Sequence, residues 1–181
     1  MNLTILSLSA SETSVGRVCA QALKNIWRAA DHHVQLIDVR SLPPVWVDNR
    51  GLPGLPPEYA AVDAALRASD GVVLAHPIYC YTASSPAKAI TEIFGKALEK
   101  MPVGILASAG SVRSHLAVGD LMQSMMFEQA TVCHPKPVMA TRDDLDGDGL
   151  LPEFAARLRA FADDFPRFAL ALQPYRRPAP Q

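Results

Sequence analysis

The chain contains 181 residues, 49% of them hydrophobic, which is enough for one domain with a full core and too little for two. Its formal net charge of −1 comes from acidic and basic residues scattered along the sequence, so nucleic acid and anionic membranes are not expected partners. The three cysteines lie far apart without a CxxC pair, which argues against a disulfide framework or a zinc knuckle.

The first part of the chain alternates short apolar runs with an amphipathic segment. Residues 3–8 are apolar and partly β-branched, as is typical of a buried strand. Apolar side chains at i, i+3, i+4 and i+7 predict a helix over residues 15–27, with Ser14 as its N-cap. Residues 34–39 predict a second strand. Five prolines within residues 41–57 predict a long loop after it.

The middle of the chain repeats this alternation. A helix is predicted over residues 58–68, and the uninterrupted apolar run 71–75 predicts a central parallel strand. Ser85 and Pro86 are typical of the N-cap and first position of the next helix. Residues 103–107 resemble the run 71–75 and predict a fourth strand.

The last part is expected to contain two helices and an edge strand. Pro135 and Pro137 fall within the extended stretch 131–140, and proline cannot donate to both sides of a ladder, so this strand should lie at an edge. The final helix should open at Pro152 and stop or kink at Pro166. The helix before the edge strand is rich enough in methionine for part of it to form an oligomer interface. Its expected inward residues are Val118, Leu121, Met122, Met125 and Met126.

Five strands alternating with five helices predict an α/β fold, in which right-handed crossovers build an open, doubly wound parallel sheet. We expect a single domain over residues 1–173 and a flexible tail over residues 174–181. In such sheets, ligands bind beyond the carboxyl ends of the strands.

The cysteine pattern also favours a reducing compartment. The first residues lack a basic leader region, and no apolar run approaches the roughly 20 residues needed to cross a bilayer. We therefore expect a cytoplasmic protein with no membrane and no nucleic acid as partner.

Two segments that follow predicted strands carry the functional signal. Residues 8–14 offer the hydroxyls of Ser9, Ser11 and Ser14 at a helix N-terminus, where an anion such as a phosphate is favoured. Residues 77–82 offer one proline and two tyrosines, which suit a flat ring. Together they suggest flavin mononucleotide, FMN. The alternative is that the serines only cap a helix and that the tyrosines only pack at a loop.

These segments resemble the NADPH-dependent FMN reductases of flavodoxin-like fold, especially those that supply reduced flavin to two-component sulfonate monooxygenases. Residues 8–14 are similar to the family motif Gly-Ser-x-Arg-x-x-Ser, with Leu8 in place of the glycine and Ser11 in place of the arginine. Pro77, Tyr79 and Lys88 match a second motif. Residues 107–111 and 116–118 look like the family's Ala-Thr-Gly-Gly-Ser and Leu-Ala-Val.

The resemblance implies a three-layer fold with five parallel strands in the order 2-1-3-4-5. It also implies an NAD(P)H-dependent FMN reductase that transfers hydride from NADPH or NADH to the flavin, with quinone or azo compounds left open as further acceptors. It also implies a homodimer or homotetramer and allows a partner monooxygenase. No catalytic side chain is expected, because the flavin carries the redox chemistry. The residues implied to bind the cofactor are Ser9, Ser11, Ser14, Val15, Gly16, Pro77, Ile78, Tyr79, Tyr81, Ala109, Gly110 and Ser111.

Two other functions remain open at this point. A flavodoxin-like electron carrier fits less well, because carriers of this fold are usually strongly acidic and this chain is nearly neutral. A module that has lost flavin is favoured by Leu8 and Ser11. A calcium site is not expected, although residues 144–149 copy half of an EF-hand loop, because Ala155 stands where the bidentate glutamate should be.

Overall fold

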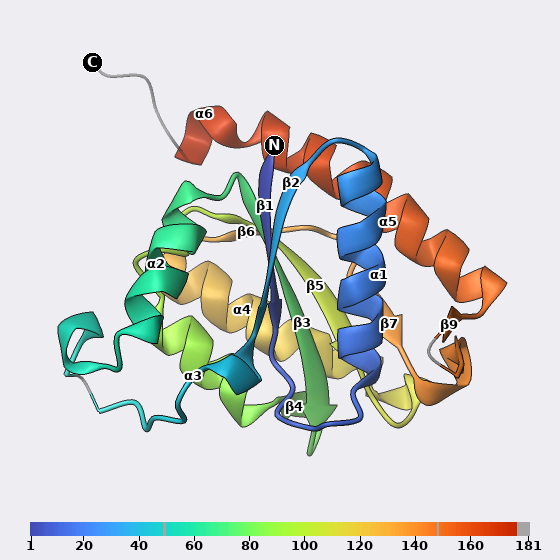
Figure 1. Ribbon diagram of the computed structural model, residues 1–181, viewed down its shortest axis with the longest axis horizontal. Coiled ribbons are helices and arrows are strands. Elements are labelled where there is room, and N and C mark those ends of the chain that lie inside the picture. Colours follow the sequence, from blue (N-terminus) through green and yellow to red (C-terminus); the bar gives the residue numbers. More distant parts are fainter. Residues whose placement is uncertain (49, 148, 177–181) are drawn as a thin grey trace.

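A parallel sheet with helices on both faces forms the centre of the molecule (Figure 1). The computed structural model describes residues 1–48, 50–147 and 149–176. The strand order is β2-β1-β3-β5-β6, with β7 also parallel to β5 and β4 antiparallel to β3. The main-sheet strands are β1 (Asn2–Ser7), β2 (His33–Asp38), β3 (Gly71–Tyr79), β4 (Thr82–Ala83), β5 (Pro102–Ser108), β6 (Val132–Cys133) and β7 (Val138–Ala140). The predicted doubly wound sheet and its order are confirmed.

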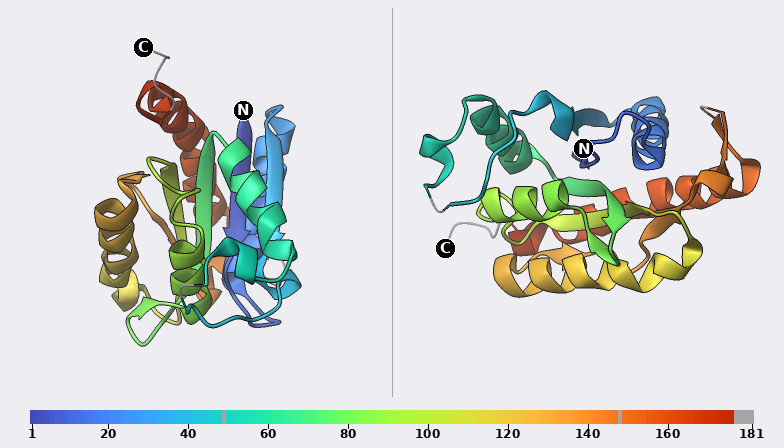
Figure 2. Two further views of the ribbon diagram at one scale, coloured as in Figure 1. Left: turned by 90° about the vertical axis from the view of Figure 1, so that its left-hand side faces the viewer. Right: turned by 90° about the horizontal axis from the view of Figure 1, so that it is seen from below.

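The helices form two layers, one on each face of this sheet (Figure 2). Helices α1 and α5 cover one face, and α2, α3 and α4 cover the other. The helices are α1 (Val15–Ala29), α2 (Glu58–Ala68), α3 (Ser85–Ile93), α4 (Val118–Gln129), α5 (Pro152–Ala171) and α6 (Gln173–Arg176). A small hairpin of β8 (Leu145–Asp146) and β9 (Gly149–Leu150) precedes α5. In the described part of the chain, no helix combines the length and apolar character needed to span a membrane.

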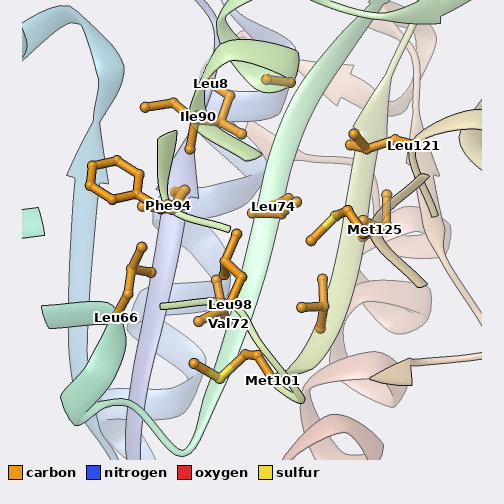
Figure 3. Close-up of a cluster of buried hydrophobic side chains, with 14 of the residues drawn as sticks. Leu8, Leu66, Val72, Leu74, Ile90, Phe94, Leu98, Met101, Leu121 and Met125 are labelled. Atoms are coloured by element: carbon orange, nitrogen blue, oxygen red, sulfur yellow. The ribbon is translucent and has the colours of Figure 1, made fainter. Parts of the chain in front are cut away.

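The two layers enclose separate hydrophobic clusters because side chains alternate along each strand. On β3, Val72 and Leu74 face the α2, α3 and α4 side, whereas Val73 and Ala75 face the α1 and α5 side. Leu8, just beyond β1, lies in the first cluster with Ile90 of α3 (Figure 3). The side chain that replaces the family's glycine is therefore buried in the core.

Several predicted boundaries need correction. The strand expected over residues 71–75 runs on to Tyr79. The N-cap of α3 is Ser84, whose hydroxyl accepts from the Ala87 amide at 3.4 Å, so Ser85 is already helical. The predicted strand 131–140 is two short strands, because the segment that contains Pro135 and Pro137 leaves the ladder between them.

Two expectations about helices are wrong in part. Met126 of α4 does not point inward but is 53% exposed. Helix α5 does not stop at Pro166 but continues to Ala171. Of the expected tail, residues 174–176 lie in α6 and residues 177–181 fall outside the described residues.

A tryptophan compensates for the proline inside α5. Pro166 has no N–H group, so it cannot bond to the carbonyl of Ala162, four residues earlier. The indole N–H of Trp27 in α1 donates to that carbonyl at 2.8 Å in the buried interface between the two helices. The orphaned acceptor is thereby satisfied, which explains why the helix tolerates its proline.

We expect Trp27→Phe to lower the free energy of unfolding by about 1–2 kcal/mol, because it leaves the Ala162 carbonyl buried without a donor. Urea unfolding followed by circular dichroism measures this loss. In a Pro166→Ala background, residue 166 regains its N–H and the same substitution should cost less. An equal cost in both backgrounds would contradict the explanation.

Candidate active site

The loop between β1 and α1 forms one wall of the candidate site. Ser14 caps α1, and its hydroxyl accepts from the Arg17 amide at 3.2 Å. Ser9 is buried, and its hydroxyl accepts from the Ser11 amide at 3.3 Å. The first N–H groups of a helix have no acceptor within the helix, so this end of α1 attracts an anion.

Arg17 holds this loop in shape from within α1. Its guanidinium donates to the carbonyls of Ser9, Ser11 and Glu12 at 2.8 to 3.1 Å. It also pairs with Asp38 at 2.9 Å, at the end of β2. Because the loop carbonyls turn toward Arg17, the loop is fixed before any ligand binds.

Asp38 remains a carboxylate in this arrangement. Burial raises its pKa, but hydrogen bonds from Arg40 and the charges of Arg17 and Arg40 outweigh that effect, and the pKa of Asp38 lies below its ordinary value. Asp38 therefore keeps its negative charge beside Arg17 at neutral pH.

The end of β3 forms a second wall. Its last residues continue into a hairpin with β4, in which Ile78 pairs with Ala83. The two turn residues, Cys80 and Tyr81, both have positive φ, 51° and 65°, a conformation that costs non-glycine residues free energy. The Tyr81 hydroxyl donates to the Arg113 carbonyl at 2.9 Å, which ties the hairpin to the next loop.

The end of β5 forms the third wall. Ser108 closes the strand, and the Ala109 amide then donates to the Ala140 carbonyl at 3.0 Å, which anchors the following loop. Helix α1 approaches this strand closely: a Cβ placed on Gly16 would lie 3.1 Å from the Ser108 hydroxyl. Glycine at position 16 therefore allows the start of α1 to sit against β5.

These walls enclose a cavity of about 230 Å³ at the carboxyl ends of the strands. In Figure 1 the carboxyl end of β3 is its lower end. This is the edge at which open α/β sheets bind ligands. Among the described residues that line it there is no carboxylate and no histidine. The lining residues are Ser9, Thr13, Ser14, Val15, Pro77, Ile78, Tyr79, Ser108, Ala109, Gly110 and Arg142.

Residues 1–144, most of the chain, match the sequence model of a family described as NADPH-dependent FMN reductase. The chain belongs to this family. Its membership confirms the predicted family and the expectation of an NAD(P)H-dependent flavin reductase, an oxidoreductase. No curated protein matches the chain in sequence.

Solved structures of flavoproteins share the fold of this FMN reductase family member. The apo form of the NADH:FMN oxidoreductase EMOB is 21% identical, with a TM-score of 0.77, over 93% of this chain and 88% of that one. The NAD(P)H:(acceptor) oxidoreductase FerB from Paracoccus denitrificans is 16% identical, with a TM-score of 0.76, over 93% and 97%. An archaeal flavodoxin is 12% identical, with a TM-score of 0.65, over 93% and 99%.

The structure brings together most of the residues that the family resemblance implied. The residues of that set that line the cavity are Ser9, Ser14, Val15, Pro77, Ile78, Tyr79, Ala109 and Gly110. The other four, Ser11, Gly16, Tyr81 and Ser111, are absent from the described lining. The binding roles of all twelve residues remain predictions.

Those four residues shape the loops around the cavity. The Ser11 hydroxyl donates to the Thr13 carbonyl at 3.1 Å, within the first loop. The Ser111 hydroxyl accepts from the Arg113 amide at 3.2 Å and caps the short helix η3 (Val112–Ala117). Tyr81, 55% exposed, stands on the hairpin outside the cavity.

Sequence reasoning missed three lining residues: Thr13, Ser108 and Arg142. Thr13 lies inside the recognised loop but at a variable position of its motif. Arg142 comes from the turn after β7, which the topology places beside β5. Ligands bind beyond the carboxyl ends of the strands in open α/β sheets, so the position of Arg142 directly after a predicted strand was the signal that could have identified it.

The cavity suits FMN by the chemistry of its lining. Hydroxyls and main-chain amides gather at the start of α1, where a phosphate needs donors. Pro77, Ile78 and Ala109 offer apolar surface for a ring. His76, next to Pro77 of the lining, is buried, and burial lowers its pKa although a backbone hydrogen bond with Pro77 opposes this. His76 is therefore neutral at neutral pH.

Proposed function

We propose that FMN binds in this cavity, with its phosphate at the start of α1 and its ring between the ends of β3 and β5. The observation that carries the proposal is one continuous cavity that joins a hydroxyl-rich helix N-terminus to an apolar, aromatic rim. Membership of the FMN reductase family supports the same ligand.

The phosphate end works through donors that are already in place. Ser9 and Ser14 present hydroxyls, and Val15, the first residue of α1, lines the same space. Arg17 and Asp38 hold the loop that carries them, so little ordering is needed on binding. The described lining contains no carboxylate that would repel the phosphate.

The ring end orients the reacting groups. Pro77 and Ile78 offer a rigid apolar edge, and Ala109 and Gly110 offer small residues on the opposite side. Tyr79 lines the cavity and is still 53% exposed, so the rim is open to a nicotinamide nucleotide. When bound, FMN supplies the acceptor for hydride from the reduced nicotinamide.

A visible spectrum and a coupled assay test the proposal. FMN is titrated into the purified protein, and NADPH and NADH oxidation are then followed at limiting flavin. Turnover that depends on flavin is the expected result. Flavin bound without turnover would indicate an electron carrier instead, and absence of flavin uptake would contradict the proposal.

We expect Ser9→Ala with Ser14→Ala to weaken FMN binding by roughly 1–3 kcal/mol, because two hydrogen bonds to a charged group are lost. Quenching of flavin fluorescence measures the affinity. Riboflavin, which lacks the phosphate, is the control ligand and should bind both proteins equally. Unchanged FMN affinity would count against the phosphate position. Because Ser14 also caps α1, thermal unfolding should accompany the titration.

The finer predictions belong to this proposal as well. A homodimer or homotetramer is supported by the exposed apolar side chains of Met126 and Phe127 on α4, the latter 85% exposed. Donor preference between NADPH and NADH, a partner monooxygenase and a cytoplasmic location are further expectations. Sedimentation velocity measures the assembly, and the coupled assay measures the donor preference.

A further inference from the structure

Arg142 is the charged side chain in the described lining of the cavity. It begins the short helix η4 (Arg142–Asp144), directly after β7. Within the described part of the chain, its guanidinium has no hydrogen-bond or ion-pair partner. Its charge is therefore available to a ligand in the cavity.

The neighbouring charged groups are already engaged. Asp144 accepts from the Thr141 amide at 2.7 Å and from Arg157 at 2.7 Å, so both oxygens of its carboxylate are already hydrogen-bonded. Arg17 is bonded to loop carbonyls and to Asp38. Ser11, which stands where the resembling family has an arginine, is absent from the described lining.

The topology places Arg142 at the phosphate end of the cavity. Strand β7 runs parallel to β5, with Ala140 opposite Ser108. Ser108 in turn lies against the first turn of α1, as the close approach of Gly16 shows. The turn after β7 therefore opens near the start of α1, and β5 separates it from the aromatic rim at the end of β3.

We infer that Arg142 binds the phosphate of the flavin and sets the preference of this site for FMN over riboflavin. The inference rests on the proposed function. A cation that approaches from the turn after β7 supplies the charge that Ser11 cannot. The 2′-phosphate of NADPH is the competing anion, but the hydroxyls of Ser9, Thr13 and Ser14 share the cavity with Arg142 and favour the flavin's own phosphate.

The test compares the affinities of FMN and riboflavin in wild type, Arg142→Gln and Arg142→Lys. Arg113→Gln is the matched control, because Arg113 is an exposed arginine of η3 outside the described lining. Fluorescence titration gives the ratio of the two dissociation constants. We expect Arg142→Gln to weaken FMN about tenfold and to leave riboflavin unchanged. Arg142→Lys should keep most of the preference, and Arg113→Gln all of it.

The role of Arg142 would be overturned by unchanged FMN affinity in Arg142→Gln, by equal loss of both flavins, or by an equal effect of Arg113→Gln. If Arg142→Gln weakened only the preference for NADPH over NADH, Arg142 would be assigned to the nicotinamide nucleotide. That result would also overturn its role at the flavin phosphate. Wild-type protein that bound neither flavin would contradict the proposed function itself. Tight wild-type FMN binding with an unchanged ratio in Arg142→Gln would contradict only the inference.

Discussion

Thr13→Glu is expected to weaken FMN binding by about 3 kcal/mol, or roughly 100-fold, as measured by fluorescence titration. Thr13 is exposed and lines the cavity beside Ser14, so the new carboxylate would face the phosphate dianion across a few ångströms. The same negative charge near the N-terminus of α1 favours the helix. The variant should therefore fold as well as wild type and lose only the ligand.

Thr13→Gln separates charge from size, since the two side chains have nearly the same shape. It should bind FMN almost as wild type does. The loss in Thr13→Glu should also shrink as salt is added, because the repulsion is screened. If both variants bind FMN like wild type, the phosphate does not lie at this loop.

Gly104→Val should lower the free energy of unfolding by about 3 kcal/mol or more. Gly104 lies in the middle of β5, where a Cβ would stand 2.6 Å from Cζ of Phe161 and 3.1 Å from the ring of Phe165. Both phenylalanines belong to the buried cluster under α5, so neither can move without opening that layer.

Denaturant unfolding measures this loss. Gly119→Ala in α4 is the control, because nothing lies within 4 Å of its Cβ position and alanine favours a helix. The control should be neutral or stabilising. Equal stability of Gly104→Val and wild type would show that α5 does not press on the sheet at this point.

Local patterns in the sequence were enough to predict most of the fold. The helix after Ser14 was predicted because its cap and its apolar period are both local signals. The central strands were predicted from uninterrupted apolar runs, and the order of the sheet followed from the family resemblance. Pro135 and Pro137 correctly predicted that the stretch 131–140 lies at an edge of the sheet. They did not predict that it forms two separate strands.

Long-range contacts explain what the sequence could not predict. Pro166 is a stop signal by local rules, and only a tryptophan more than a hundred residues away makes it tolerable. Met126 fits the apolar period of α4, yet its side chain is 53% exposed. Arg142 joins the cavity only because β7 lies next to β5. In each case the deciding neighbour is distant in sequence.

A crystal structure of the protein with FMN tests the central claim most directly. We predict the phosphate within hydrogen-bond distance of Ser9, Ser14 and the first amides of α1, with the ring between the ends of β3 and β5. Leu8 should remain in the core, where Figure 3 places it. A flavin bound elsewhere, or a cavity closed by Leu8 in the presence of excess FMN, would contradict the account.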